Sequence, residues 1–198
     1  IAGGGYSLAR PVLDLAITDY LGLSKHPKII EAASAIINKD GVGAGASRLV
    51  TGSRPIHKEL EENLADWLGQ ESVLLFPSGF QANLAAVLAL ADRSTTVIAD
   101  RLIHHSLLIG VKASGAKLKR FAHNDVHDLE RHLKLCNSQN NRLKSLVLTE
   151  SLFSMEGSSP PLHKIAKLCK KYNARLLVDE AHALGVIGPE GRGLCYGV

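Results

Sequence analysis

The chain has 198 residues, of which 45% are hydrophobic and 21% charged, and its formal net charge is +4 at pH 7. This composition indicates a globular protein with a sizeable core, and no apolar run approaches the roughly 18 residues of a membrane span. The basic residues have no interleaved aromatic side chains, which argues against nucleic-acid binding. Three widely spaced cysteines and no recognisable signal peptide favour a reduced, cytoplasmic protein.

Helical spacing of apolar residues predicts helices over residues 27–38 and 56–68, with a glycine-rich loop over 41–52 between them. Further along, short β runs and helical segments alternate. The predicted strands are 72–76, 95–100, 117–121, 145–150 and 174–179, and the predicted helices are 81–91, 105–114, 126–135 and 161–172. This alternation predicts a three-layer α/β/α fold with a mostly parallel sheet and helices on both faces.

We expect two parts in the chain. Residues 1–40 form an N-terminal segment with one helix, and residues 41–198 form the first part of a larger domain. A doubly wound sheet that ends on its most polar strand lacks later strands to cover it. We therefore expect the chain to belong to a longer protein.

The most informative stretch is 175–182, where an apolar run ends in Asp179 and Glu180, and His182 follows. It predicts a buried parallel strand with a carboxylate at its C-terminal edge, where open α/β sheets bind ligands. Such a carboxylate can pair with a cationic ring nitrogen, as proteins do when they tune pyridoxal phosphate as an electron sink. The alternative is an aspartate that only caps the following helix.

Three other segments at strand ends carry polar groups. The turn at 78–80 precedes a helix, whose N–H groups and dipole favour a phosphate, although Ser78 could be a simple N-cap. His104 could lie over a planar cofactor, or it could be structural. Glu150 and Ser154 suit a ring hydroxyl or a substrate carboxylate, unless they mark an ordinary exit from the strand.

Two other candidate sites are rejected. No metal site is expected, because the adjacent His104 and His105 point apart and no residue cluster has zinc-like spacing, while His123, His127 and His132 are expected on a surface helix. The glycine-rich loop at 41–52 follows a helix rather than a strand, so it does not predict dinucleotide binding.

Taken together, six segments resemble the α-oxoamine synthases, which are pyridoxal-phosphate enzymes of the aspartate-aminotransferase fold, fold type I. The segments, in the family's order, are 19–24, 41–52 with 56–57, 76–83, 100–106, 149–157 and 179–193. The resemblance implies pyridoxal 5'-phosphate (PLP) as cofactor, an amino acid and an acyl thioester as substrates, and a homodimer with a shared active site. It implies neither a nucleic-acid nor a membrane partner.

Carried over by position, the resemblance implies that Asp179 pairs with the pyridinium nitrogen, His182 bonds the phenolic oxygen and His104 stacks on the ring. These three are the predicted catalytic residues. The other residues implied to bind the cofactor are Ser78, Gly79, Phe80, Glu150 and Ser154. The family's Schiff-base lysine follows the Asp-x-x-His motif at a greater distance than this chain reaches, so no residue here is assigned that role.

Within the family, residues 99–102 and 120–125 are most similar to the members that condense L-alanine with a pimeloyl thioester, with loss of CO2, in biotin biosynthesis. Members that use glycine or serine share most of the motifs and stay open as alternatives. An aminotransferase of the same fold and a non-catalytic subunit stay open as well.

Overall fold

The computed structural model describes residues 14–139 and 144–198 and divides the chain into two compact units, Ile1–Gly45 and Ala46–Val198. The first unit contains a short 3-10 helix η1 (Leu23–Lys25) and helix α1 (Pro27–Asp40). None of the side chains of α1 is buried in this structure. The expected division into residues 1–40 and 41–198 stays a prediction, and its first 13 residues lie outside those described.

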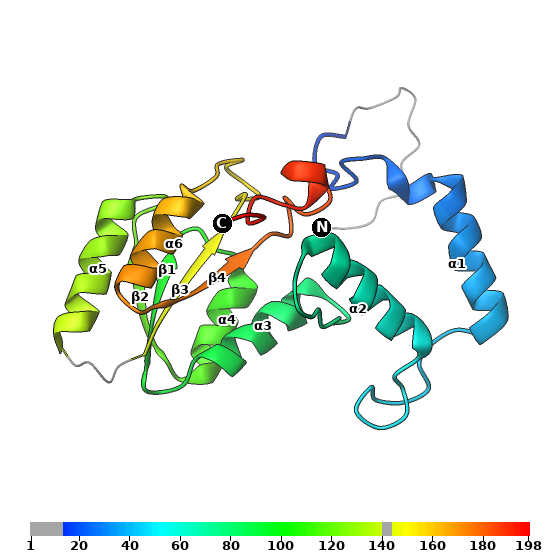
Figure 1. Cartoon of the computed structure of the whole chain (residues 1–198), viewed down its shortest axis with the longest axis horizontal. Coiled ribbons are helices and arrows are strands. Elements are labelled where there is room, and N and C mark those ends of the chain that lie inside the picture. Colours follow the sequence, from blue (N-terminus) through cyan, green and yellow to red (C-terminus); the bar gives the residue numbers. More distant parts are fainter. Residues whose placement is uncertain (1–13, 140–143) are drawn as a thin grey trace, which may run out of the picture. The chain divides into compact units, whose positions relative to one another are not determined.

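The second unit begins with α2 (Pro55–Leu68) and continues as alternating helices and strands (Figure 1). The order is α3 (Gly79–Leu90), β1 (Thr95–Asp100), α4 (His105–Ser114), β2 (Lys117–Phe121), α5 (Val126–Gln139), β3 (Lys144–Glu150), α6 (Leu162–Lys171), β4 (Arg175–Asp179) and the 3-10 helix η2 (Pro189–Gly191). The four strands form one parallel sheet in the order β2-β1-β3-β4. The predicted α/β class is therefore confirmed.

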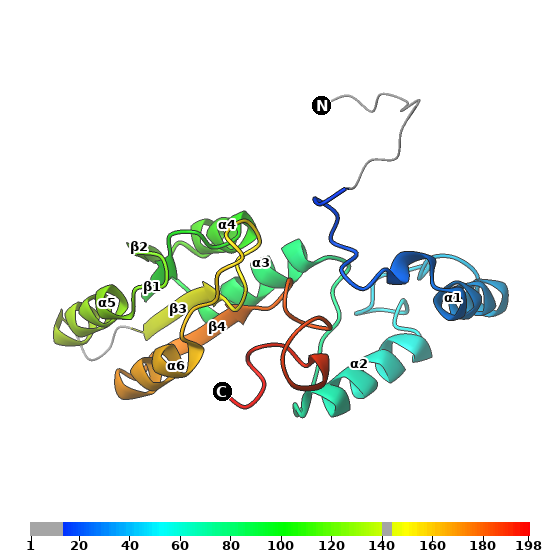
Figure 2. The same cartoon turned by 90° about the horizontal axis from the view of Figure 1, so that it is seen from above.

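Helices cover both faces of this sheet, as predicted (Figure 2). One buried cluster joins Val97 and Leu148 of the central strands to α3 and α4. A second joins Ile98 and Val147, the neighbouring residues on the same strands, to α5 and α6. Because side chains alternate along a strand, the uninterrupted apolar runs of β1 and β3 serve both clusters.

The predicted strand at 72–76 is wrong, because the structure has irregular backbone there. The Leu75 backbone N–H donates to Glu61 Oε1 at 2.8 Å, and the Leu75 carbonyl accepts from Arg48 at 3.3 Å. These backbone groups thus bond to side chains, whereas a strand requires a neighbouring strand as partner. The composition of the segment is β-like, but the part of the chain that the structure describes places no strand beside it.

Among the described residues, no helix combines the length and the apolar character that crossing a bilayer requires.

Candidate active site

The acidic residues at the strand ends are sorted onto opposite faces of the sheet. Leu148 and Leu177 contact the cluster under α3 and α4, so Glu150 and Asp179, two residues later on β3 and β4, lie on that face. These two residues are direct neighbours in the register of the sheet. Asp100 follows Ile98 of the opposite cluster, and it bonds to residues that precede α5. Only two of the three acids therefore share a face.

A chain of hydrogen bonds connects Asp179 to His104. The side-chain amide of Asn83 on α3 donates to Asp179 Oδ2 at 2.7 Å and to Ser106 Oγ at 3.0 Å. Ser106 Oγ lies 2.6 Å from His104 Nδ1. Asn83 and Ser106 were not among the residues singled out from the sequence, although both lie in segments that carried the resemblance.

Close contact between α3 and α4 makes this chain of bonds possible. A Cβ added at Gly110 of α4 would lie 2.8 Å from the Cβ of Val87 on α3, closer than side chains tolerate. The absence of a side chain at Gly110 lets the two helices approach. Asn83, one helical turn before Val87, then reaches Ser106, which is one turn before Gly110.

Glu150 is a buried acid beside these hydrogen-bonded residues, with only 5% of its surface exposed. Burial and the negative charge of Asp179 raise the pKa of Glu150 to about 7, although a hydrogen bond from the backbone N–H of His104 opposes the shift. A buried carboxyl that titrates near neutral pH at a sheet edge is typical of a functional site.

Asp179 also takes part in the local turn. Its Oδ1 accepts from the Ala181 backbone N–H at 2.9 Å, and its carbonyl accepts from Ser151 N–H. One carboxylate oxygen of Asp179 thus caps a turn, not the helix that the alternative interpretation expected, because residues 181–186 form turns. The other oxygen bonds Asn83. His182 lies in the same turn and is half-buried.

The predicted phosphate turn lies at the start of α3. Ser78 is the N-cap, and its Oγ accepts from the Gln81 backbone N–H at 3.3 Å, so the simple capping role is present. Gly79 and Phe80 begin the helix and are exposed, and nothing lies within 4 Å of a Cβ added at Gly79. Ser154 is exposed in the loop after β3. Phosphate binding by the turn stays a prediction.

Asp100 anchors a separate polar cluster on the α5 side. This fully buried acid accepts from His123 Nδ1 at 3.0 Å and from the Asn124 backbone N–H at 2.8 Å, while His123 Nε2 lies 2.8 Å from Ser158 Oγ. His123 precedes α5, which begins at Val126, so its expected place on a surface helix is wrong. No described group of three or more His, Cys, Asp or Glu could hold a metal ion.

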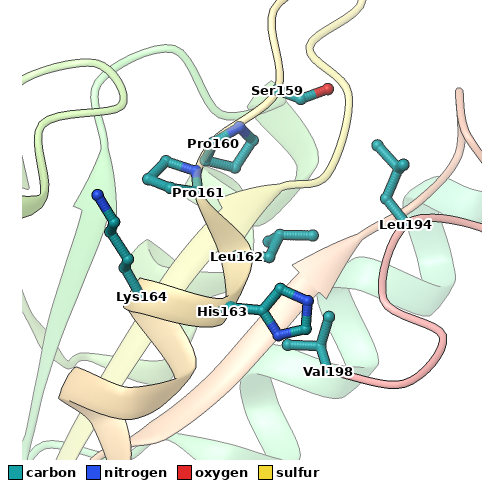
Figure 3. A pocket seen from close by; sticks show the side chains of 8 residues that line it. All are labelled: Ser159, Pro160, Pro161, Leu162, His163, Lys164, Leu194 and Val198. Carbon is teal, nitrogen blue, oxygen red and sulfur yellow. The ribbon is translucent and has the colours of Figure 1, made fainter.

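Two of the hollows among the described residues lie outside this arrangement. One of about 490 Å³ is lined by residues 159–164, Leu194 and Val198, and Figure 3 shows Leu194 and Val198 opposite the first turn of α6. Another of about 300 Å³ includes Glu180 and Cys195. Neither is lined by a residue predicted to bind the cofactor.

The aminotransferase class I and II family matches residues 10–194. The 8-amino-7-oxononanoate synthase of Salmonella choleraesuis is 46% identical over 188 residues, covering 94% of this chain and 48% of the relative. The chain thus spans about half the length of the curated relatives it matches.

Solved structures give the same picture. The serine palmitoyltransferase of S. paucimobilis, in a structure with a bound PLP–myriocin aldimine, matches with a TM-score of 0.85 and 35% identity over 90% of this chain and 44% of the other. The 8-amino-7-oxononanoate synthase of Francisella tularensis matches with a TM-score of 0.75 and 32% identity, over 93% and 50%.

Proposed function

The chain belongs to the aminotransferase class I and II family, and from this we propose that it forms the first half of a PLP-dependent α-oxoamine synthase. The favoured reaction joins L-alanine to a pimeloyl thioester, with loss of CO2, to give 8-amino-7-oxononanoate. The 46% identity to curated synthases of that name supports this choice of substrates. The observation that carries the site assignment is the hydrogen-bonded chain from His104 to Asp179 at the carboxyl edge of the sheet.

The chemistry of the donor set fits PLP. Asp179 offers a carboxylate for a protonated ring nitrogen, and the first turn of the 12-residue helix α3 offers N–H groups and a favourable dipole for a phosphate. Ser78, Gly79 and Phe80 would border that phosphate. His104 is exposed and held by Ser106, so its ring is available for stacking.

When bound, PLP supplies an electron sink for a carbanion at the amino-acid α-carbon. Asp179 would hold the proton on the ring nitrogen, and His182 would bond the phenolic oxygen. Glu150 would carry a proton part of the time near neutral pH, so the Glu150–Asp179 pair would hold less than its full two negative charges. Ser154 would contact the cofactor face.

The test is an assay of the full-length protein, in which we expect the Schiff-base lysine to follow Val198. Incubation with PLP and borohydride should add one cofactor per chain, measured by intact mass. L-Alanine with pimeloyl thioester should then give 8-amino-7-oxononanoate and CO2. Product from serine and palmitoyl thioester would instead support the serine palmitoyltransferases as the relevant relatives. Transamination without any thioester would indicate an aminotransferase, and no adduct would indicate a non-catalytic subunit.

We also propose a cytoplasmic homodimer. Ile29, Ile30 and Ile37 of α1 are each about half exposed, and so large an apolar surface on one helix favours an interface. None of the three cysteines, all of them within the described residues, forms a disulfide. A fully active monomer at working concentration, measured by light scattering, would contradict the dimer.

A further inference from the structure

The side-chain amide of Asn83 bonds two acceptors that belong to different parts of the candidate site. One N–H donates to Asp179 Oδ2 and the other to Ser106 Oγ. Since a carboxylate only accepts, the amide nitrogen, not the oxygen, faces Asp179. Asn83 and Asp179 are 96 residues apart in the sequence, so this one side chain ties α3 to the end of β4.

The same bonds determine which nitrogen of the neutral His104 ring carries the hydrogen. The Ser106 backbone N–H donates to His104 Nδ1 at 3.3 Å, which requires a lone pair on that nitrogen. Ser106 Oγ receives a hydrogen from Asn83, so its own hydroxyl hydrogen can be donated to Nδ1. In the neutral ring the proton then lies on Nε2.

We propose that Asn83 and Ser106 are positioning residues for the PLP site: Asn83 orients the Asp179 carboxylate and, through the Ser106 hydroxyl, holds the His104 ring with Nδ1 as acceptor and Nε2 as donor. The proposal rests on the proposed function for the presence of PLP, but not on the identity of either substrate. Both side chains act on the cofactor through Asp179 and His104. Glu150, His104 and His182 are titratable groups near Asp179, and all three are unchanged in the variants below.

The experiment uses the full-length protein and measures PLP affinity and the pH midpoint of the bound cofactor's visible absorption, both without substrates. Asn83→Ala removes both bonds, and we expect its Kd for PLP to rise about tenfold or more. The pH midpoint of the bound cofactor should move upward in this variant. A protonated ring nitrogen is positively charged and so disfavours a second proton on the same conjugated group. If Asp179 is less well oriented, the ring nitrogen would be protonated less of the time, and the second proton would be accepted at a higher pH.

Ser106→Ala separates the effect on His104 from the effect on Asp179, since it keeps the bond from Asn83 to Asp179. We expect it to weaken PLP binding by about threefold or more through His104, with a wild-type pH midpoint. Asn83→Ser keeps one hydroxyl donor, so its Kd for PLP and its pH midpoint should fall between those of wild type and Asn83→Ala. It also keeps the test possible if the alanine variant folds poorly. Asn137→Ala, an exposed amide on α5, is the matched control and should behave like wild type.

Wild-type affinity and midpoint in the Asn83 and Ser106 variants, with only a lower unfolding temperature, would overturn the proposal and leave the network a purely structural role. An equal shift of the midpoint in Ser106→Ala and Asn83→Ala would also overturn the division of roles. Failure of the alanine and pimeloyl-thioester assay leaves these readouts intact, so the two proposals fail separately. Failure of wild type to bind PLP at all would overturn both.

Discussion

Glu150 and Asp179 lie opposite each other at the ends of β3 and β4, and both carboxyl groups emerge on the sheet face that α3 and α4 cover. Burial and the Asp179 charge raise the pKa of Glu150 to about 7. A carboxyl that is harder to ionise in the folded state stabilises that state at low pH. This contribution is complete below the ordinary glutamate pKa of about 4.5 and is lost as pH rises through 7.

Glu150→Gln should therefore gain stability relative to wild type as pH rises from 4.5 to 7, by about 1–3 kcal/mol, with no further gain above that range. The measurement is urea denaturation of the full-length apoprotein across this range. Glu156→Gln, an exposed acid in the loop after β3, is the control and should show a much smaller change. A constant difference between Glu150→Gln and wild type would contradict the raised pKa.

Local pattern was sufficient to predict the layers of this fold. Strand β1 was predicted with its observed bounds, because an apolar run between turn residues has few other structures open to it. The segment at 72–76 has a similar composition, but Arg48 and Glu61 bond its backbone, and no strand among the described residues pairs with it. The local sequence pattern reflects only the residues of the segment itself, whereas a strand also needs a neighbouring strand, which is distant in the sequence.

The candidate site was predictable at the strand ends and not between them. Asp179 and Glu150 could be identified because a charge follows an apolar run. The role of Asn83 depends on where α3 meets β4, and His123 was expected on a helix although it bonds Asp100 from the preceding loop. A single sequence does not specify such contacts between distant elements.

Asp179→Asn should leave a folded protein that still binds PLP but has lost turnover by about 100-fold or more, because a neutral amide would not hold the ring nitrogen protonated in the proposed site. Both oxygens of Asp179 accept hydrogen bonds, and the amide can keep only one of them, so slight destabilisation is also expected. Steady-state kinetics and PLP titration of the full-length protein measure the two effects. Near-wild-type turnover would contradict the proposed pairing of Asp179 with the ring nitrogen.

His104→Ala should weaken PLP binding by about tenfold, because the proposed stacking surface is lost, while the fold is kept since the side chain is exposed. The adjacent His105→Ala, also exposed, is the matched control. Fluorescence titration of the apoprotein with PLP gives both affinities. Equal affinities for the two variants would exclude stacking by His104.

His123→Ala should destabilise the protein by about 2–3 kcal/mol, because it leaves the buried Asp100 one hydrogen bond short and removes the edge-to-face contact with Phe153. His127→Ala, one exposed histidine further along the chain, should change stability by less than about 0.5 kcal/mol. Urea denaturation compares the two variants. A similar small effect for both would mean that the backbone donors of Leu102 and Asn124 satisfy Asp100 by themselves.

The loop after β4 has no room for a side chain at Gly193. Its φ is +86°, and a Cβ there would lie 2.6 Å from Glu180 Oε2, while Glu180 Oε1 accepts from the backbone N–H groups of Leu194 and Cys195. Gly193→Ala should therefore cost backbone strain of about 1–2 kcal/mol plus the displacement of Glu180.

Gly197→Ala is the matched control for this prediction, because its φ is +82° and nothing lies within 4 Å of its added Cβ. It should show the backbone strain alone. Thermal unfolding of both variants gives the difference, which isolates the contact with Glu180. If Gly193→Ala were no less stable than Gly197→Ala, then Glu180 would move aside freely, and its bonds to residues 194 and 195 would contribute little to the loop.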